Sequence, residues 1–205
     1  MDNVQPITPH NTATLAPAEL RELQGWLMWR FEQDPNDTTG KPLKVPYYAD
    51  GGKRHGKQGG IDDRGRMTTF AAARDAAAKR GFTGVGLALM PEFGITALDF
   101  DNCVNAQGEL PQEIEEITSR TYAEYSPSGK GIRAFVRGSY GNRKSPTVGN
   151  DYGFETFTST GFVTFTGNIM PYTDLFGLED TIAHLDALVA PLCAARFVAS
   201  QQQAI

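Results

Sequence analysis

The most constraining stretch of this sequence is Gly84–Cys103, where two apolar runs flank a proline and a glycine and the second run ends in Asp99-Phe100-Asp101. Apolar runs separated in this way predict two adjacent strands joined by a short turn. Side chains alternate faces along a strand, so Asp99 and Asp101 share one face while Leu98 and Phe100 point into the core. The two carboxylates are then about 6 to 7 Å apart, close enough to grip one divalent ion or a close pair of ions.

Composition places the chain among soluble globular proteins. It has 205 residues, 40% hydrophobic and 21% charged, enough for one domain of ordinary core size with extensions. No apolar run approaches the roughly 20 residues that span a bilayer, and the polar N-terminus has no signal-peptide core, so we expect a cytoplasmic protein without membrane contact. Two cysteines, Cys103 and Cys193, are too few for a disulfide framework or a zinc cluster, and we expect both to be structural thiols.

The net charge of −5 argues against a nucleic-acid binder, but the distribution of charge matters more than its sum. Residues 41–66 hold seven Lys or Arg against three Asp, and residues 120–144 hold six against Glu124 alone. A chain that is acidic overall can therefore present a positive groove. The alternative is that these are solvated loop charges.

Strands and helices alternate along the chain, but hairpins are frequent, which favours an α+β fold with a mixed or antiparallel sheet and flanking helices. We expect a mobile N-terminal tail (1–16), one main domain (17–173) and a helical C-terminal extension (174–205). We predict a short helix that begins at Pro17. Three further predicted helices span Phe70–Lys79, Glu109–Arg120 and Leu178–Val198, and the last of these is kinked at Pro191. The remaining predicted elements are strands at Trp26–Phe31, Leu43–Tyr48 and Ile132–Val136, a hairpin of Phe154–Thr158 with Gly161–Thr166, a flexible loop at Gly51–Gly65 and a polar loop at Asn142–Asp151.

A second motif lies at Ser126–Arg133, with the sequence Ser-Pro-Ser-Gly-Lys-Gly-Ile-Arg. Two glycines let the backbone approach a ligand closely, and successive amides in such a turn form an anion nest. The serine hydroxyls are additional donors, and the lysine and arginine add positive charge. The segment leads into a strand rather than a helix, so it is a candidate phosphate-binding turn but not a Walker P-loop.

A third motif is Glu155, a single carboxylate among aromatic β-formers, which would be either outward-facing or aimed at the metal site. Each motif also has a plainer interpretation. The Asp-x-Asp pair fits an ordinary solvated turn, and the Ser-Gly-Lys-Gly segment fits a hairpin turn with basic decoration.

In this order the three motifs resemble those of the archaeo-eukaryotic primase superfamily. The stretch 25–168 is similar to the primase-polymerase (PrimPol) domain of phage and plasmid replication proteins. The resemblance rests on Trp26–Phe31, Lys44-Val45-Pro46, Phe70–Lys79, Gly84-Val85-Gly86, Asp99–Asp101, Tyr125–Gly131 and Glu155–Asn168. It implies an RRM-like sheet with flanking helices, the catalytic core of that superfamily.

The resemblance also implies a template-dependent DNA primase and polymerase that transfers dNTPs or NTPs to a 3′-hydroxyl in phage or plasmid replication. Asp99, Asp101 and Glu155 would be catalytic and would hold Mg²⁺ or Mn²⁺. The triphosphate would lie against Ser126, Ser128, Gly129, Lys130, Gly131 and Arg133. A single-stranded template or primer-template would follow Lys44, Lys53, Arg54, Lys57, Arg143 and Lys144.

The sequence departs from the family pattern at Arg133, where the family often has His. Arginine keeps a permanent charge and a bidentate fork but cannot titrate near neutral pH. One alternative is a non-catalytic DNA-binding replication module with the same fold, of which Arg133 would be the mark. A separate alternative is a metal-dependent nuclease. The family often carries a helicase downstream, so a helicase domain or protein is an expected partner.

Overall fold

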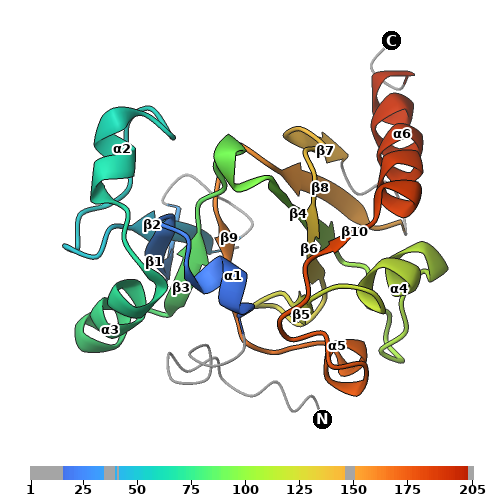
Figure 1. Cartoon of the computed structure of the whole chain (residues 1–205), viewed down its shortest axis with the longest axis horizontal. Helices are drawn as coiled ribbons and strands as arrows, with labels where there is room; N and C mark the ends of the chain where they lie inside the picture. The colour runs from blue at the N-terminus through green and yellow to red at the C-terminus, as the bar shows by residue number, and fades with distance from the viewer. Residues whose placement is uncertain (1–15, 35–39, 41, 146–150, 203–205) are drawn as a thin grey trace. The chain divides into compact units, whose positions relative to one another are not determined.

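The computed structural model describes residues 16–34, 40, 42–145 and 151–202, the last five through their backbone alone (Figure 1). The chain forms two compact units, one of Met1–Ala88 with Phe162–Gly167 and the other of Leu89–Gly161 with Asn168–Ile205. Antiparallel sheets and flanking helices confirm the predicted α+β class. The predicted tail lies outside the described residues except for Ala16, and the predicted domain limits stay predictions.

Among its described residues, the first unit contains one antiparallel sheet and three helices. The strand order is β2 (Leu43–Tyr47), β1 (Trp26–Glu32), β3 (Gly84–Leu87) and β9 (Val163–Thr164). The helices are α1 (Ala18–Arg21), α2 (Ile61–Arg66) and α3 (Phe70–Arg80), and α3 packs against β1 and β3. Pro46 lies in the edge strand β2, as a residue without an N–H donor requires.

Helix α3 has the ends that its sequence predicts. The Thr69 hydroxyl accepts a hydrogen bond from the Ala72 amide (3.2 Å), and Gly81 takes the left-handed conformation that ends the helix. Trp26 is fully buried and packs edge-on against Phe70 of α3, with 4.7 Å between ring centroids. The capping signals and the aromatic contact together fix this helix on the sheet.

The second unit contains a mixed sheet in the order β10-β6-β4-β8-β7, with β5 also paired to β6. All pairings are antiparallel except β10 with β6. The strands are β4 (Ile95–Asp101), β5 (Ala123–Tyr125), β6 (Ile132–Arg137), β7 (Arg143–Ser145), β8 (Gly153–Phe157) and β10 (Ala183–His184). The helices are the 3₁₀ turn η2 (Pro91–Phe93), α4 (Gln112–Thr118), α5 (Pro171–Leu175) and α6 (Asp186–Gln202).

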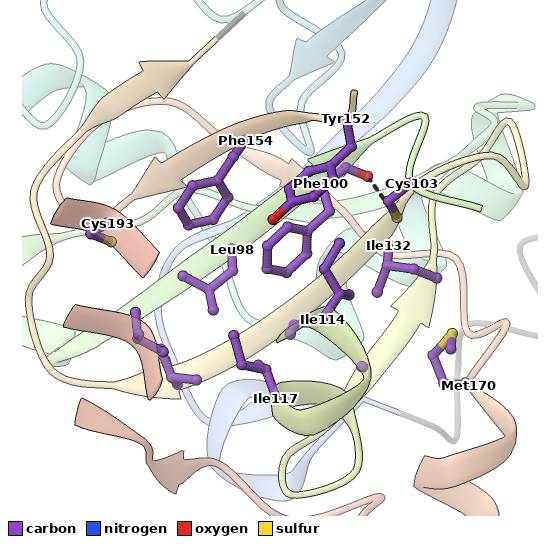
Figure 2. Packing of buried hydrophobic residues seen from close by; sticks show 14 of the residues in the cluster. Leu98, Phe100, Cys103, Ile114, Ile117, Ile132, Tyr152, Phe154, Met170 and Cys193 are labelled. Carbon is purple, nitrogen blue, oxygen red and sulfur yellow. Dashed lines mark hydrogen bonds between the residues drawn. The ribbon is translucent and has the colours of Figure 1, made fainter. Parts of the chain in front are cut away.

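One face of this sheet is apolar and forms the core of the second unit (Figure 2). Leu98 and Phe100 of β4 are fully buried there, and the Phe100 ring stacks on Phe154 with 4.9 Å between centroids. Ile114 and Ile117 of α4 belong to the same cluster, together with Val189, Cys193 and Phe197 of α6. Asp99 and Asp101 are only half-buried, whereas Leu98 and Phe100 are fully buried, and this burial pattern confirms the predicted alternation.

Two predicted strand pairings are wrong. The apolar runs of Gly84–Cys103 form β3 and β4, which belong to different sheets rather than lying side by side. The predicted hairpin near residue 160 does not form either, because β8 pairs with β4 and β7 whereas β9 pairs with β3. Hydrophobic alternation identifies strands and their buried faces but carries little information about the partner strand.

Several predicted loops contain regular structure. Helix α2 begins within the predicted loop Gly51–Gly65, and β7 begins within the polar loop Asn142–Asp151, of which residues 146–150 lie outside the described residues. Helix α6 starts only at Asp186, after strand β10, and includes Pro191. Helix α5 was not predicted. These elements are short or begin in polar sequence, so they lack the sustained periodicity that marks longer ones.

We expect Gly131→Ala to lower the free energy of unfolding by about 1–3 kcal/mol, because overpacking forces neighbouring atoms to shift. A Cβ at this position would lie 2.6 Å from the Phe100 carbonyl oxygen. Urea denaturation measures the change. Gly65→Ala is the control, since its Cβ would meet open space in α2, and it should be neutral or stabilising by up to about 1 kcal/mol. Equal effects of the two substitutions would contradict the close approach at Gly131.

Candidate functional site

A row of five charged residues crosses the second unit's sheet, one from each of five neighbouring strands. In order they are Glu124 (β5), Arg133 (β6), Asp99 (β4), Glu155 (β8) and Lys144 (β7), each directly opposite the next in the strand register. Directly opposite residues of antiparallel strands project from the same face. The structure therefore brings Asp99 and Glu155 together, although 56 positions separate them in the sequence numbering.

The two cations of the row face carboxylates in different settings. The Arg133 side chain is 3% exposed, and its Nε lies 3.2 Å from Asp99 Oδ1 without hydrogen-bond geometry. The Lys144 ammonium forms an ion pair with Glu155, and the Lys144 side chain is 69% exposed. The hydrogen bond to Glu155 raises the pKa of Lys144 against the opposing effect of burial, and the charges of Glu155, Asp101 and Asp99 raise it further. Lys144 therefore lies in the field of all three predicted catalytic carboxylates.

The surroundings of Asp101 contain little side-chain bulk. Gly153 lies opposite it on β8, and Gly131 approaches from the β6 side so closely that a Cβ there would be 3.5 Å from the Asp101 Cα. Asn102 follows in a left-handed conformation (φ 55°), which turns the chain away at the end of β4. The backbone at Gly131 therefore packs closely against the end of β4, and neither Gly131 nor Gly153 projects a side chain beside Asp101.

The Ser-Gly turn, residues 126–131, connects β5 to β6 and lies beside Asp101. Its amides are bonded within the turn: Gly129 N–H donates to the Ser126 carbonyl (2.9 Å), Gly131 N–H to Ser126 Oγ (3.2 Å) and Lys130 N–H to Ser128 Oγ (3.3 Å). These three amides are engaged and do not form the predicted anion nest. Ser128 and Lys130 are exposed, whereas Ser126 is buried, so the groups that can reach a phosphate are the Lys130 ammonium and the Ser128 hydroxyl.

The predicted DNA-binding residues divide between the units, with Lys44, Lys53, Arg54 and Lys57 in the first and Arg143 and Lys144 in the second. Lys57 is exposed, and Lys53 is exposed with its ammonium 3.1 Å from Glu32 Oε2. Arg143 is exposed, with its guanidinium 5.7 Å from the Phe197 ring centroid. These positions are compatible with backbone contacts to a nucleic acid.

Arg54 occupies a different kind of position. Its side chain is 2% exposed and donates two hydrogen bonds to Asp63, Nε to Oδ1 (2.9 Å) and a terminal nitrogen to Oδ2 (2.8 Å). The Tyr48 hydroxyl and the Gly59 amide donate to the same carboxylate, each at 2.7 Å. The predicted role of Arg54 on the template backbone is at odds with this burial, because its guanidinium already holds the loop to α2.

The sequence-based reasoning missed Glu124, which is fully buried and accepts a hydrogen bond from the Tyr122 hydroxyl (3.0 Å). It lies opposite Arg133 in the β5–β6 hairpin. Its signal in the sequence is its place before the Ser-Gly turn, because a hairpin register counted from that turn pairs it with Arg133. A buried carboxylate is rarely retained without a cation close by.

The carboxylates fit a divalent cation in their chemistry, but they do not form a ready cluster. Aspartate and glutamate oxygens are the hard ligands that Mg²⁺ and Mn²⁺ prefer, and Asp99 Oδ1 accepts no hydrogen bond from the described residues. Across the described side chains, however, no three His, Cys, Asp or Glu residues converge closely enough to hold a metal ion. The ion pair of Glu155 with Lys144 keeps the third carboxylate engaged elsewhere.

Comparison of the sequence with protein-family models gives no match, and comparison with curated proteins gives none either. Within the part of the chain that the structure describes, no helix combines the length and the apolar character needed to cross a membrane.

We expect Arg54→Ala to lower the free energy of unfolding by about 3–5 kcal/mol, because it leaves the buried Asp63 carboxylate without its cation. Urea denaturation followed by circular dichroism measures this. Lys57→Ala removes an exposed cation from the same loop and should stay within about 0.5 kcal/mol of wild type. If Arg54→Ala weakened DNA binding without loss of stability, the structural role of Arg54 would be wrong.

We expect both cysteines to resist thiol reagents in the folded protein. Both are free and buried, and burial raises the pKa of Cys103 to about 12 and that of Cys193 to about 11. Thiols stay protonated below their pKa, so at pH 8 their reaction with a disulfide reagent should be at least about 100-fold slower than in urea-unfolded protein. Absorbance of the released thiolate measures both rates, and equal rates would contradict the burial.

Proposed function

We propose that this chain is a template-dependent DNA primase and DNA polymerase module, which transfers dNTPs or NTPs to a 3′-hydroxyl. The observation that carries the proposal is the strand register that sets Glu155 opposite Asp99, with the Ser-Gly turn beside Asp101. The three motifs are far apart in the sequence, and their resemblance to primases rests on their order along the chain. On the sheet they lie next to one another. An α+β fold with antiparallel sheets and flanking helices is compatible with the RRM-like primase core that we propose here.

In this proposal Asp99 and Asp101 hold the divalent ions through their carboxylate oxygens, and Glu155 completes the site or orients the 3′-hydroxyl. When bound, Mg²⁺ or Mn²⁺ lowers the pKa of that hydroxyl and neutralises charge on the departing pyrophosphate. The glycines that flank Asp101, Gly131 and Gly153, carry no side chain that would compete with the ions for its carboxylate.

Lys130 and Ser128 contact the triphosphate from the exposed side of the turn. Arg133, at 3% exposure, is better suited to hold Asp99 in place than to wrap around a triphosphate. We therefore reassign Arg133 from the triphosphate to a positioning role. A permanently charged guanidinium suits this role, because it does not lose its proton near neutral pH.

The template or primer-template backbone follows exposed basic residues, of which Lys53, Lys57 and Arg143 are available, and its binding weakens as salt rises. We propose a helicase, as a separate protein or a further domain, as a partner. The proposed biological setting is phage or plasmid replication.

A second candidate is a non-catalytic DNA-binding module. The observation that favours it is the pairing of each central carboxylate with a cation, Asp99 with Arg133 and Glu155 with Lys144, which leaves the row without a converging acidic cluster. In such a module the charged row would serve the sheet alone.

We expect Asp99→Ala and Asp101→Ala to reduce primer extension with Mn²⁺ and dNTPs below detection, and Glu155→Gln to reduce it by about 10- to 100-fold, as loss of a supporting carboxylate does. Glu116→Gln is the control, because this exposed glutamate lies on α4, which packs against the opposite face of the sheet. It should extend primers like wild type. Gel-resolved incorporation of labelled nucleotide measures all four variants.

Three outcomes discriminate the candidates. Extension that survives in the Asp99→Ala/Asp101→Ala double variant would refute the site. DNA binding without incorporation by wild type would favour the non-catalytic module. Metal-dependent cleavage of single-stranded DNA in the absence of nucleotides would point to a nuclease.

A further inference from the structure

We propose that Lys144 is an internal counter-ion of the carboxylate site. Its ammonium is paired with the Glu155 carboxylate until a divalent cation displaces it, and this competition lowers the affinity of the site for the cation. The inference rests on the metal site of the proposed function and adds to it a positioning residue on the opposite side of Glu155 from Asp99.

The geometry places Lys144 at the end of the charged row. It lies on β7, the edge strand of the sheet, directly opposite Glu155, and its ammonium contacts the Glu155 carboxylate. Glu155 in turn lies opposite Asp99. Like charges directly opposite each other on a sheet are destabilising, so a cation on Glu155 relieves the repulsion between the two carboxylates. A divalent cation would do the same and would compete for the same oxygens.

The two cations of the row differ in how easily they can leave. Arg133 lies on an inner strand and is 3% exposed, so removing it from Asp99 would leave buried charge uncompensated. Lys144 is 69% exposed, on a flexible four-carbon stem that can turn into solvent. Ion pairs of this exposed kind are weak. Arg133 is therefore the fixed cation, and Lys144 the exchangeable one.

Displacement has a measurable consequence. When only a fraction of the protein is in the state that can bind a ligand, the apparent affinity for that ligand falls by the same fraction. The Lys144–Glu155 ion pair would therefore lower the apparent affinity of the protein for the metal. If the pair is occupied most of the time, its removal should tighten metal binding by about fivefold, the range expected for breaking a pair of this exposure.

The test is the dissociation constant of Mn²⁺ for the whole folded chain, measured by electron paramagnetic resonance without DNA or nucleotide. Lys144→Met keeps the length of the side chain and removes its charge, and it should bind Mn²⁺ about fivefold more tightly than wild type. Lys144→Arg keeps the charge and should bind no more tightly than wild type. Lys79→Met, an exposed lysine on α3, is the matched control and should leave the dissociation constant unchanged.

A double variant separates displacement from a general change in charge. Glu155→Gln removes the partner of Lys144, so Lys144→Met/Glu155→Gln should bind Mn²⁺ no more tightly than Glu155→Gln alone. A gain that persists in the double variant would overturn the proposal, because it would show that Lys144 acts through long-range charge rather than by occupying Glu155.

Failure of this inference is distinguishable from failure of the proposed function. If wild type binds Mn²⁺ in a manner that Asp99→Ala abolishes, but Lys144→Met has the wild-type affinity, then the metal site stands and the counter-ion role is wrong. If Mn²⁺ binding is undetectable in wild type and in Lys144→Met, or if Asp99→Ala leaves it unchanged, then the metal site and the inference both fail. Binding detected only in Lys144→Met would support the counter-ion role in its strongest form.

Discussion

The candidate site depends on the register between β4 and its two neighbours. Antiparallel pairing sets Asp99 opposite Arg133 on one side and opposite Glu155 on the other. A slip of one residue would turn every side chain of β4 to the other face, and Leu98 and Phe100 would lose their places among the helices. The apolar face therefore enforces the register, and the arrangement of charges on the opposite face follows from it. The packing residues of β4 and its charged residues thus lie on opposite faces of the same strand.

The charged row also shows how a sheet can tolerate carboxylates side by side. Its signs run negative, positive, negative, negative, positive from Glu124 to Lys144, so the only like-charge neighbours are Asp99 and Glu155. Their exposed fractions of 14% and 18% mean that water screens their repulsion only in part. Each of the two carboxylates also faces a cation on its other side, Asp99 facing Arg133 and Glu155 facing Lys144. In the proposed function, the divalent cation would bind next to these two carboxylates and offset their like charges.

The sequence allowed the local features to be predicted and left the long-range ones open. The alternation at Asp99–Asp101 and the capped helix α3 follow from periods of two and 3.6 residues and from side chains near the helix ends. The partners of β3 and β9 could not be derived, because pairing depends on which apolar faces meet after collapse. Arg54 looked like a surface cation because composition alone carries no information on burial, and Asp63, its partner, is nine residues away in a stretch without apolar periodicity. Glu124 became visible only through the hairpin register.

The first unit is completed by a segment that the chain supplies late. Strand β9 pairs with β3, and the Phe165 ring packs against Trp26 with 4.9 Å between centroids. Strand β9 and Phe165 both belong to the segment Phe162–Gly167, which follows β8 in the sequence. As the nascent chain leaves the ribosome, β3 has an open edge until residues beyond β8 have been made, and open edges invite pairing with other chains. A fragment that stops at Ala88 would retain that edge. No single cut of the chain separates the two units, and the first unit can complete its sheet only after β8 of the second has been synthesised.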